Sequence, residues 1–370
     1  MHSVVAPLLA ALAATQPPQA GSVLLPQPAT LAGSLVVRMY SSKVKAVATR
    51  MGETLTAYHA SSSQCPKLSK SDLALQKPLY ENATRKPFLW THIHKCAGSS
   101  MCALANLNNE NMTKAQSTMN CNTCGDTCRI SVAETMACEA SWAARNCAYS
   151  ASLSCTARQN RATRSSFMGQ ERFVDVELCP AEELNYGIML REPLERLISN
   201  TQYARDMEGY GAWDVSPEQV LSLIQPNASS CLDGPCDDCM NCDTVERSPA
   251  AYDNLYVRTL AGYDAFTLPA GRLTRAHLQA AKARLSAYSV VLILDEYENH
   301  EPQLSHWLGW TVTSLASERV TETKERSSFF TDEQLDTLAR ANELDYELYC
   351  FAKSLAAART AEVSGIRRLP

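Results

Sequence analysis

Lys95 stands at a junction between two kinds of local sequence. The residues before it, FLWTHIH (88–94), are rich in strand-forming types, and the residues from Gly98 onward suit a helix. A turn that leads into a helix N-terminus presents unpaired backbone N–H groups, which bind anions. Lys95 together with Ser99 and Ser100 therefore predicts a site of the phosphate-binding type at this junction.

The order of residues at the junction is K-x-x-G-S-S. It differs from the Walker A loop, G-x-x-x-x-G-K-[ST], because Lys95 precedes Gly98 instead of following it. A structural alternative explains the same residues: Ser99 or Ser100 could cap an ordinary helix while Lys95 lies in solvent. The junction alone leaves both interpretations open.

A second cluster of anion-binding residue types follows the apolar run LNYGIML (184–190). Arg191 comes directly after this predicted buried strand, and Arg196, Ser199 and Tyr203 follow with the spacing of one helix face. An arginine can bind a phosphate through two N–H groups, and a serine can donate one more hydrogen bond. The alternative is an ordinary surface helix with Arg–Glu ion pairs.

Strand-like and helix-like segments alternate along the chain. The sequence predicts strands that begin at Phe88 and span 184–190 and 289–297, and helices after Gly98 and over 193–206, 250–261, 274–288, 299–308 and 331–357. This alternation predicts an α/β fold in which helices cover both faces of a central parallel sheet. Ligands bind beyond the carboxyl ends of such strands, so Lys95 and Arg191 are expected at the same edge.

The chain divides into three predicted regions. Residues 1–85 carry Pro-, Gln- and Ser-rich patches and are interpreted as a targeting segment and linker. Residues 86–358 form the folded domain, with cysteine-rich insertions at about 121–155 and 231–242, and residues 359–370 form a C-terminal tail. The net charge of -5 argues against a nucleic-acid-binding protein, because phosphate backbones require a basic surface.

Fifteen cysteines are far more than cytosolic proteins usually carry. Because most of them fall in loop-like sequence, they predict disulfide bonds in an oxidising compartment. Zinc is the alternative, since CNTCGDTC (121–128) and CDDCMNC (236–242) have spacings that could supply thiolate ligands.

The favoured compartment is a lumen of the secretory pathway. Glycosylation sequons at Asn82, Asn111 and Asn227 agree with secretion. The run VVAPLLAALAA (4–14) has the length of a signal peptide, but it lacks a basic start and is too short to span a bilayer, so membrane association is expected only through this N-terminal segment. Organelle import is the alternative, because RMYSSKVK (38–45) resembles a presequence cleavage region.

Four stretches, taken in order, resemble motifs of one enzyme family. They are HIHKCAGSS (92–100), LREPLERLIS (190–199), YDNLYVRTLAG (252–262) and VVLILDEYENHEPQLSHWLGW (290–310). The first resembles the 5'-phosphosulfate loop of sulfotransferases that use 3'-phosphoadenosine 5'-phosphosulfate (PAPS), and the second resembles their R-x-P-x-x-R-x-x-S 3'-phosphate motif. The other two resemble segments of Golgi carbohydrate sulfotransferases, with the heparan-sulfate 6-O- and 2-O-sulfotransferases as the nearest suggestion.

The resemblance implies a P-loop-like three-layer fold and sulfuryl transfer from PAPS to a carbohydrate hydroxyl of a glycan, proteoglycan or polysaccharide. Lys95 is implied as the catalytic residue that stabilises charge on the bridging oxygen of the leaving nucleotide. The residues implied in donor binding are Lys95, Cys96, Ala97, Gly98, Ser99, Ser100, Arg191, Ser199 and Arg258. No metal is required, since positioning and fixed positive charge take the role that Mg²⁺ has in a kinase.

The acceptor hydroxyl also needs a base. Glu134 and Glu139 stand where other carbohydrate sulfotransferases carry a glutamate base, and the alternative is that both are solvent-facing helix residues. Relatives of the 6-O type use a histidine downstream of the loop, which this chain lacks, and His92 and His94 are interpreted as packing or loop-supporting residues. Cys96 replaces the family's threonine or glycine and is expected to stay outside any disulfide, which leaves an even number of other cysteines.

Two other functions fit the same residues. One is a catalytically inactive, disulfide-stapled glycan-binding protein on the same fold. The other is a phosphoryl-transfer enzyme, which nucleotide preference would separate from a sulfotransferase.

Overall fold

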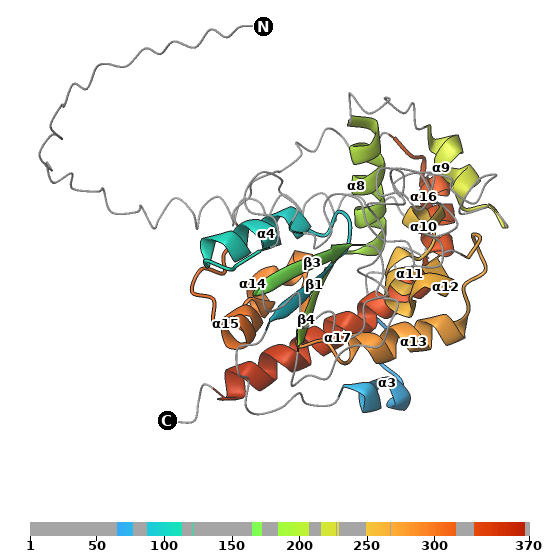
Figure 1. The fold of residues 1–370 in the computed structure, drawn as a ribbon. Helices are drawn as coiled ribbons and strands as arrows, with labels where there is room; N and C mark the ends of the chain where they lie inside the picture. Colours follow the sequence, from blue (N-terminus) through green and yellow to red (C-terminus); the bar gives the residue numbers. More distant parts are fainter. Residues whose placement is uncertain are drawn as a thin grey trace, which may run out of the picture. The chain divides into compact units, whose positions relative to one another are not determined.

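The structure is a computed structural model that describes residues 65–76, 87–112, 121, 165–171, 184–206, 216–226, 228, 249–266, 268–315 and 329–366. Its centre is a sheet of four strands in the order β3-β1-β4-β5 (Figure 1). The strands are β1 (Phe88–His92), β3 (Phe167–Glu171), β4 (Asn185–Leu190) and β5 (Val290–Ile293). All neighbours pair in parallel, so the predicted α/β class is confirmed and the carboxyl ends of the strands share one edge.

Helices cover both faces of this sheet (Figure 1). They are α11 (Leu255–Ala261), α13 (Arg275–Leu285) and α17 (Glu343–Ile366) on one face, and α4 (Gly98–Leu107) and α15 (Pro302–Leu308) on the other. Successive strand residues alternate between the two cores, as Ile188 and Leu190 pack with the first and Met189 with the second. Both faces are therefore apolar, which explains why the strands appear in the sequence as continuous hydrophobic runs.

Helix α8 (Pro193–Asp206) follows β4, as the sequence predicts. Its apolar residues Leu194, Leu197 and Ile198 are buried, and Pro193 occupies the first helical position, where its missing N–H costs nothing. Three further short helices are α9 (Pro217–Leu223), α10 (Pro249–Tyr252) and α12 (Tyr263–Phe266). Helix α10 contacts α8, α9 and α11, and α12 contacts α11.

The helix expected over 299–308 forms α14 (Tyr297–His300) and α15, with Glu301 between them, and two other predicted helices are each divided at an asparagine. The segment expected to be helical over 331–357 forms α16 (Asp332–Ala341) and α17, with Asn342 between them. The Asn342 side chain donates hydrogen bonds to the carbonyls of Tyr252 and Leu338 and accepts one from the backbone N–H of Asn254. Asn254, with φ of 54°, divides the other predicted helix into α10 and α11. One pair of asparagines therefore sets both breaks.

The structure also differs from the sequence prediction at two strands. No strand was predicted at β3, which has few apolar residues and is held by pairing with β1. The strand predicted over 289–297 ends at Ile293 and continues as a 3-10 turn, η3 (Leu294–Glu296), and as α14 (Tyr297–His300).

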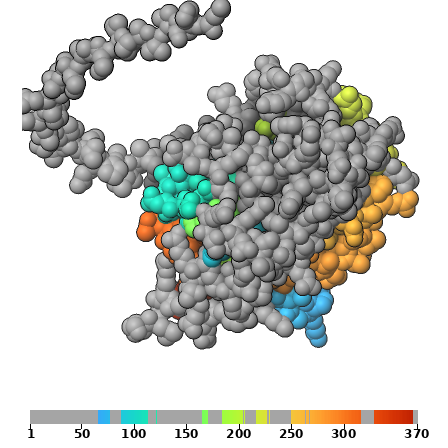
Figure 2. All heavy atoms as spheres, in the orientation of Figure 1, coloured from blue at the N-terminus to red at the C-terminus, as the bar shows by residue number. Residues whose placement is uncertain are grey.

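Part of the predicted N-terminal linker belongs to the folded unit. Helix α3 (Lys70–Leu75) lies beside α13 at the surface (Figure 2). Lys282 of α13 is buried and donates to Asp72 of α3 at 2.9 Å and to Glu347 of α17 at 2.8 Å. At the other end, α17 continues to Ile366, beyond the predicted domain end at residue 358. The ion pairs of the buried Lys282 side chain therefore join three helices that are distant in the sequence.

Two disulfides connect separate parts of the described chain. Cys65 pairs with Cys350 of α17, and Cys102 of α4 pairs with Cys121, the first cysteine of the insertion at 121–155. Cys96 is a free, buried cysteine, as expected. The other cysteines of the two insertions lie outside the described residues, as does the zinc alternative that rests on them.

Within the ranges that the structure describes, no helix has both the length and the hydropathy needed to cross a membrane.

Peptide mapping without reduction should recover the cross-links Cys65–Cys350 and Cys102–Cys121 by mass spectrometry. In each pair one cysteine is buried in a packed helix, Cys350 in α17 and Cys102 in α4, which keeps its partner in place. Cys96 should be alkylated only after unfolding, which makes it the internal control. Free thiols at Cys65 and Cys102, accompanied by stoichiometric zinc, would contradict the disulfide assignment and the oxidising compartment.

Candidate functional site

The loop between β1 and α4 has an unusual backbone. Lys95 and Ala97 both have positive φ, 66° and 59°, although neither is glycine. The loop is closed by hydrogen bonds from the Cys96 N–H to the carbonyl of Ile93 and from the Met101 N–H to the carbonyl of Ala97, both 3.1 Å. Non-glycine residues in this region are strained, and such strain persists only where the surrounding structure imposes it.

The N-terminus of α4 has no side-chain cap. Ala97 is the N-cap residue, and Ser99 and Ser100 lie in the first turn, both half-buried. The structural alternative, in which one of these serines caps the helix, is therefore wrong. The first-turn N–H groups of a helix have no acceptor within the helix, so a helix N-terminus without a side-chain cap at the carboxyl edge of the sheet suits the binding of an anion.

Gly98 is required by the close approach of His92, which is buried at the end of β1. A Cβ atom at position 98 would lie 1.7 Å from Nε2 of His92. His92 therefore packs against the loop, which agrees with its predicted supporting role. The single glycine of the motif is thus explained by contact and not by its backbone angles.

Two residues of the loop contact α8, the helix that follows β4. Nδ1 of His94 donates to Oδ1 of Asn200 at 2.8 Å, because an amide oxygen can only accept. The His94 ring also meets the edge of Tyr203, with 5.0 Å between ring centroids. Nζ of Lys95 lies 4.2 Å from the centroid of the same Tyr203 ring, a cation–π contact. Lys95 is therefore half-buried and held over α8, not extended into solvent.

Arg191 begins the segment after β4 and is partly enclosed. Its Nη2 lies 3.1 Å from Oε2 of Glu195, and its side chain is 15% exposed. Burial lowers the pKa of Arg191, but the carboxylates of Glu195 and Asp295 outweigh burial, so the pKa is raised and the guanidinium stays charged. Ser199 lies two turns further along α8 and is half-buried. The structure thus brings Arg191 to the same sheet edge as the loop that carries Lys95.

Tyr256 of α11 connects the two strand ends. Its hydroxyl donates to the carbonyl of Arg191 at 2.7 Å and lies 3.7 Å from Sγ of Cys96. Burial raises the pKa of the Cys96 thiol to about 11, so the thiol is neutral at physiological pH. Asp345 of α17 accepts the backbone N–H groups of Tyr256 and Val257 at 2.9 and 2.8 Å, which fixes the start of α11. Sequence reasoning missed Tyr256 and Asp345, because nothing local marks a buried tyrosine as a bridge.

Two other arginines have environments that differ from the predictions. Arg258 is fully buried, and its guanidinium donates to the side chain and carbonyl of Asp253 and to the carbonyls of residues 265, 266, 268 and 269. These bonds use its five N–H groups, so its expected contact with the donor does not fit this environment. Arg196 is likewise buried and donates to the carbonyl of Ala251, which removes it from the polar face predicted for α8.

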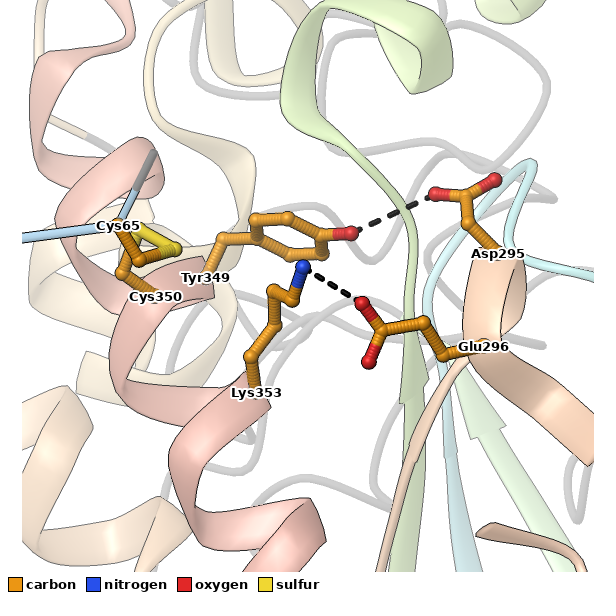
Figure 3. The surroundings of a disulfide bond; sticks show 6 residues. All are labelled: Cys65, Asp295, Glu296, Tyr349, Cys350 and Lys353. Atoms are coloured by element: carbon orange, nitrogen blue, oxygen red, sulfur yellow. Dashed lines mark hydrogen bonds and ion pairs between the residues drawn. A yellow bond between two sulfur atoms is a disulfide. The ribbon is translucent and has the colours of Figure 1, made fainter. Parts of the chain in front are cut away.

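The residues after β5 complete this edge (Figure 3). Oδ2 of Asp295 accepts weak hydrogen bonds from the backbone N–H of Glu192 and the hydroxyl of Tyr349, both 3.4 Å. Glu296 pairs with Lys353 at 2.6 Å, and both Tyr349 and Lys353 belong to α17, next to the Cys65–Cys350 bond. Helix α17 therefore also fixes the carboxyl end of β5.

Glu134 and Glu139, the predicted bases, lie outside the described residues. Their role stays a prediction.

No protein-family model matches this chain, and no curated protein matches it either.

Gly98→Ala should lower the free energy of unfolding by about 1–3 kcal/mol, because the added methyl group overpacks the buried His92 ring. Urea denaturation measures the change. Gly365→Ala is the matched control: its Cβ meets nothing within 4 Å and it lies in helix α17, so it should be neutral or stabilising by up to about 1 kcal/mol. Equal stability of the two variants would contradict the packing assigned to Gly98.

Proposed function

We propose that the protein is a PAPS-dependent sulfotransferase with a P-loop-like three-layer fold, which transfers a sulfuryl group to a carbohydrate hydroxyl. The observation that carries the proposal is that the lysine-bearing loop after β1 and Arg191 after the adjacent strand β4 meet at one edge, bridged by Tyr256. PAPS carries phosphates on both the 5' and 3' oxygens of its ribose and therefore needs two separate anion-binding groups. ATP carries its phosphates on the 5' oxygen alone.

The donor groups on the protein suit such a ligand. The N-terminus of α4 lacks a side-chain cap, and Nε of Arg191 is buried with no hydrogen-bond partner among the residues that the structure describes. A buried polar atom without a partner is costly, so a ligand that accepts these hydrogen bonds gains affinity. Both features support binding of an anion with two phosphate groups.

In the proposed reaction, Lys95 lies beside the bridging oxygen and stabilises the negative charge that develops there. The N–H groups of α4 with Ser99 and Ser100 hold the 5'-phosphate, while Arg191 with Ser199 holds the 3'-phosphate. The acceptor oxygen forms a bond to sulfur as the bond from sulfur to the bridging oxygen breaks. The acceptor proton passes to a base, for which Glu134 or Glu139 is proposed.

The proposal includes the lumen of the Golgi as the compartment and a glycan, proteoglycan or polysaccharide as the acceptor. The bonds Cys65–Cys350 and Cys102–Cys121 support an oxidising environment. Import into another organelle stays the alternative.

Adenosine 3',5'-bisphosphate should raise the melting temperature of the protein, because a ligand that binds only the folded state stabilises it by about 2.7 kcal/mol at 100 times its Kd. ATP with Mg²⁺ should have a much smaller effect, since it offers no 3'-phosphate to Arg191. Differential scanning fluorimetry with both ligands makes the comparison. An equal response to ATP would favour a phosphoryl-transfer enzyme instead.

Lys95→Ala should lower turnover at saturating PAPS by orders of magnitude while weakening donor binding less, because Lys95 acts chiefly on charge that develops in the transition state. Arg191→Ala should instead weaken donor affinity by about 2–3 kcal/mol, since it removes a contact shared by ground and transition states. A sulfate-transfer assay on heparan sulfate and chondroitin, combined with calorimetry of adenosine 3',5'-bisphosphate, separates the two effects.

Lys70→Ala, which removes an exposed lysine of α3, is the charge-matched control and should leave both quantities unchanged. Saturated turnover near wild type in Lys95→Ala would show that the mechanism assigned to the loop is wrong. Binding by the wild type without transfer to any tested glycan would favour the inactive glycan-binding alternative.

A further inference from the structure

The binding edge of Arg191, which precedes α8, is partly occupied by Glu195 of the first turn of that helix. Oε2 of Glu195 lies 3.1 Å from Nη2 of Arg191, and the two side chains are only 28% and 15% exposed. A pair that is this enclosed is screened less by water than an ordinary surface pair. Glu195 therefore competes with any anion that approaches this guanidinium.

The geometry of the guanidinium shows which of its N–H groups Glu195 leaves without an acceptor. Nε–H and Nη2–H lie on the same side of the group, and an oxyanion that binds side-on accepts from both. Glu195 accepts from Nη2, while Nε is buried and has no hydrogen-bond partner within the described part of the chain. The Glu195 contact is thus incomplete, and a phosphate could satisfy both atoms.

The position of Glu195 is set by α8 itself. Glu195 lies in the first turn, where the helix dipole favours an acidic side chain, and its backbone N–H donates to Oε2 of Glu192 at 2.6 Å. Asp295, at the end of β5, adds a second carboxylate that acts on Arg191. Both carboxylates repel an approaching anion, and a dianion is both attracted and repelled more strongly than a monoanion, so a ligand gains from Arg191 only where its phosphate takes the place of Glu195 on the guanidinium.

We propose that Glu195 limits the affinity of this anion site for 3'-phosphorylated nucleotides, as an internal carboxylate that holds Arg191 until a phosphate dianion displaces it. This inference rests on the proposed function, because the ligand concerned is a nucleotide with a 3'-phosphate. A nucleotide with a 3'-hydroxyl has no group that competes with Glu195 and gains nothing from Arg191. Glu195 thus lowers the affinity for 3'-phosphorylated ligands alone, so the bisphosphate is favoured over adenosine 5'-phosphate by less than it would be without this carboxylate.

The test is calorimetric titration of wild type and Glu195→Gln with adenosine 3',5'-bisphosphate and with adenosine 5'-phosphate. Glutamine keeps the size of the side chain but removes the charge that competes for Arg191. The variant should bind the bisphosphate about tenfold more tightly, which corresponds to about 1.4 kcal/mol, and should bind adenosine 5'-phosphate with less than about a twofold change. Glu298→Gln, at an exposed position of α14, removes the same charge elsewhere and should change neither affinity.

Each outcome decides a different point. If wild type and variant bind the bisphosphate equally, or the variant binds it more weakly, Glu195 has no competing role although the proposed function stands. An equal gain for both ligands would show a general charge effect and overturn the direct competition for Arg191. Failure of all proteins to bind the bisphosphate would overturn the proposed function as well. Glu195→Asp, which shortens the side chain by one methylene, should show a smaller gain and serves if the glutamine variant does not fold.

Discussion

The site depends on one buried hydrogen bond, from the hydroxyl of Tyr256 to the carbonyl of Arg191. Parallel pairing alone places the ends of β1 and β4 side by side, but it does not orient the segments that follow them. Tyr256 contacts both, since its hydroxyl also lies near Cys96 in the loop. Asp345 in turn accepts two N–H groups at the start of α11, and burial raises the pKa of this carboxyl to about 7 although both hydrogen bonds favour the charged form. The long helix α17 thus positions the loop through α11.

Three arginines that were predicted from the sequence to bind anions differ in their burial, and therefore in what they can bind. Arg258 is enclosed by carbonyl groups and by Asp253, so its charge stabilises a turn between helices. Arg196 is directed into the protein, where it contacts the carbonyl of Ala251. Arg191 alone among the three keeps partial exposure at the sheet edge, and the internal partner that it has there, Glu195, is itself partly exposed. Desolvation explains the environment of Arg258, whose enclosed guanidinium satisfies its N–H groups within the protein, whereas Nε and Nη1 of Arg196 are buried without a hydrogen-bond partner among the described residues.

The two ends of the described chain are joined to the core that carries the site. Cys65 is bonded to Cys350, one residue from Tyr349, which donates to Asp295 at the end of β5 (Figure 3). Lys282 of α13 also forms a buried ion pair with Asp72 of α3. The segment that carries Cys65 and α3 resembles a linker in composition, but it supports helix α17, which in turn fixes the carboxyl ends of two strands.

The sequence by itself determined the features that depend on neighbours along the chain. Apolar runs marked β1 and β4, and the turn at Lys95 with the following helix was evident from residue types, because propensity and periodicity are local properties. Only the tertiary structure decided the path of the chain at Asn342, the pairing of β3, and the enclosure of Arg196 and Arg258. These features rest on contacts between distant residues, such as Asn254 with Asn342, and a side chain's burial and hydrogen-bond partners are set by those contacts and not by its neighbours in sequence.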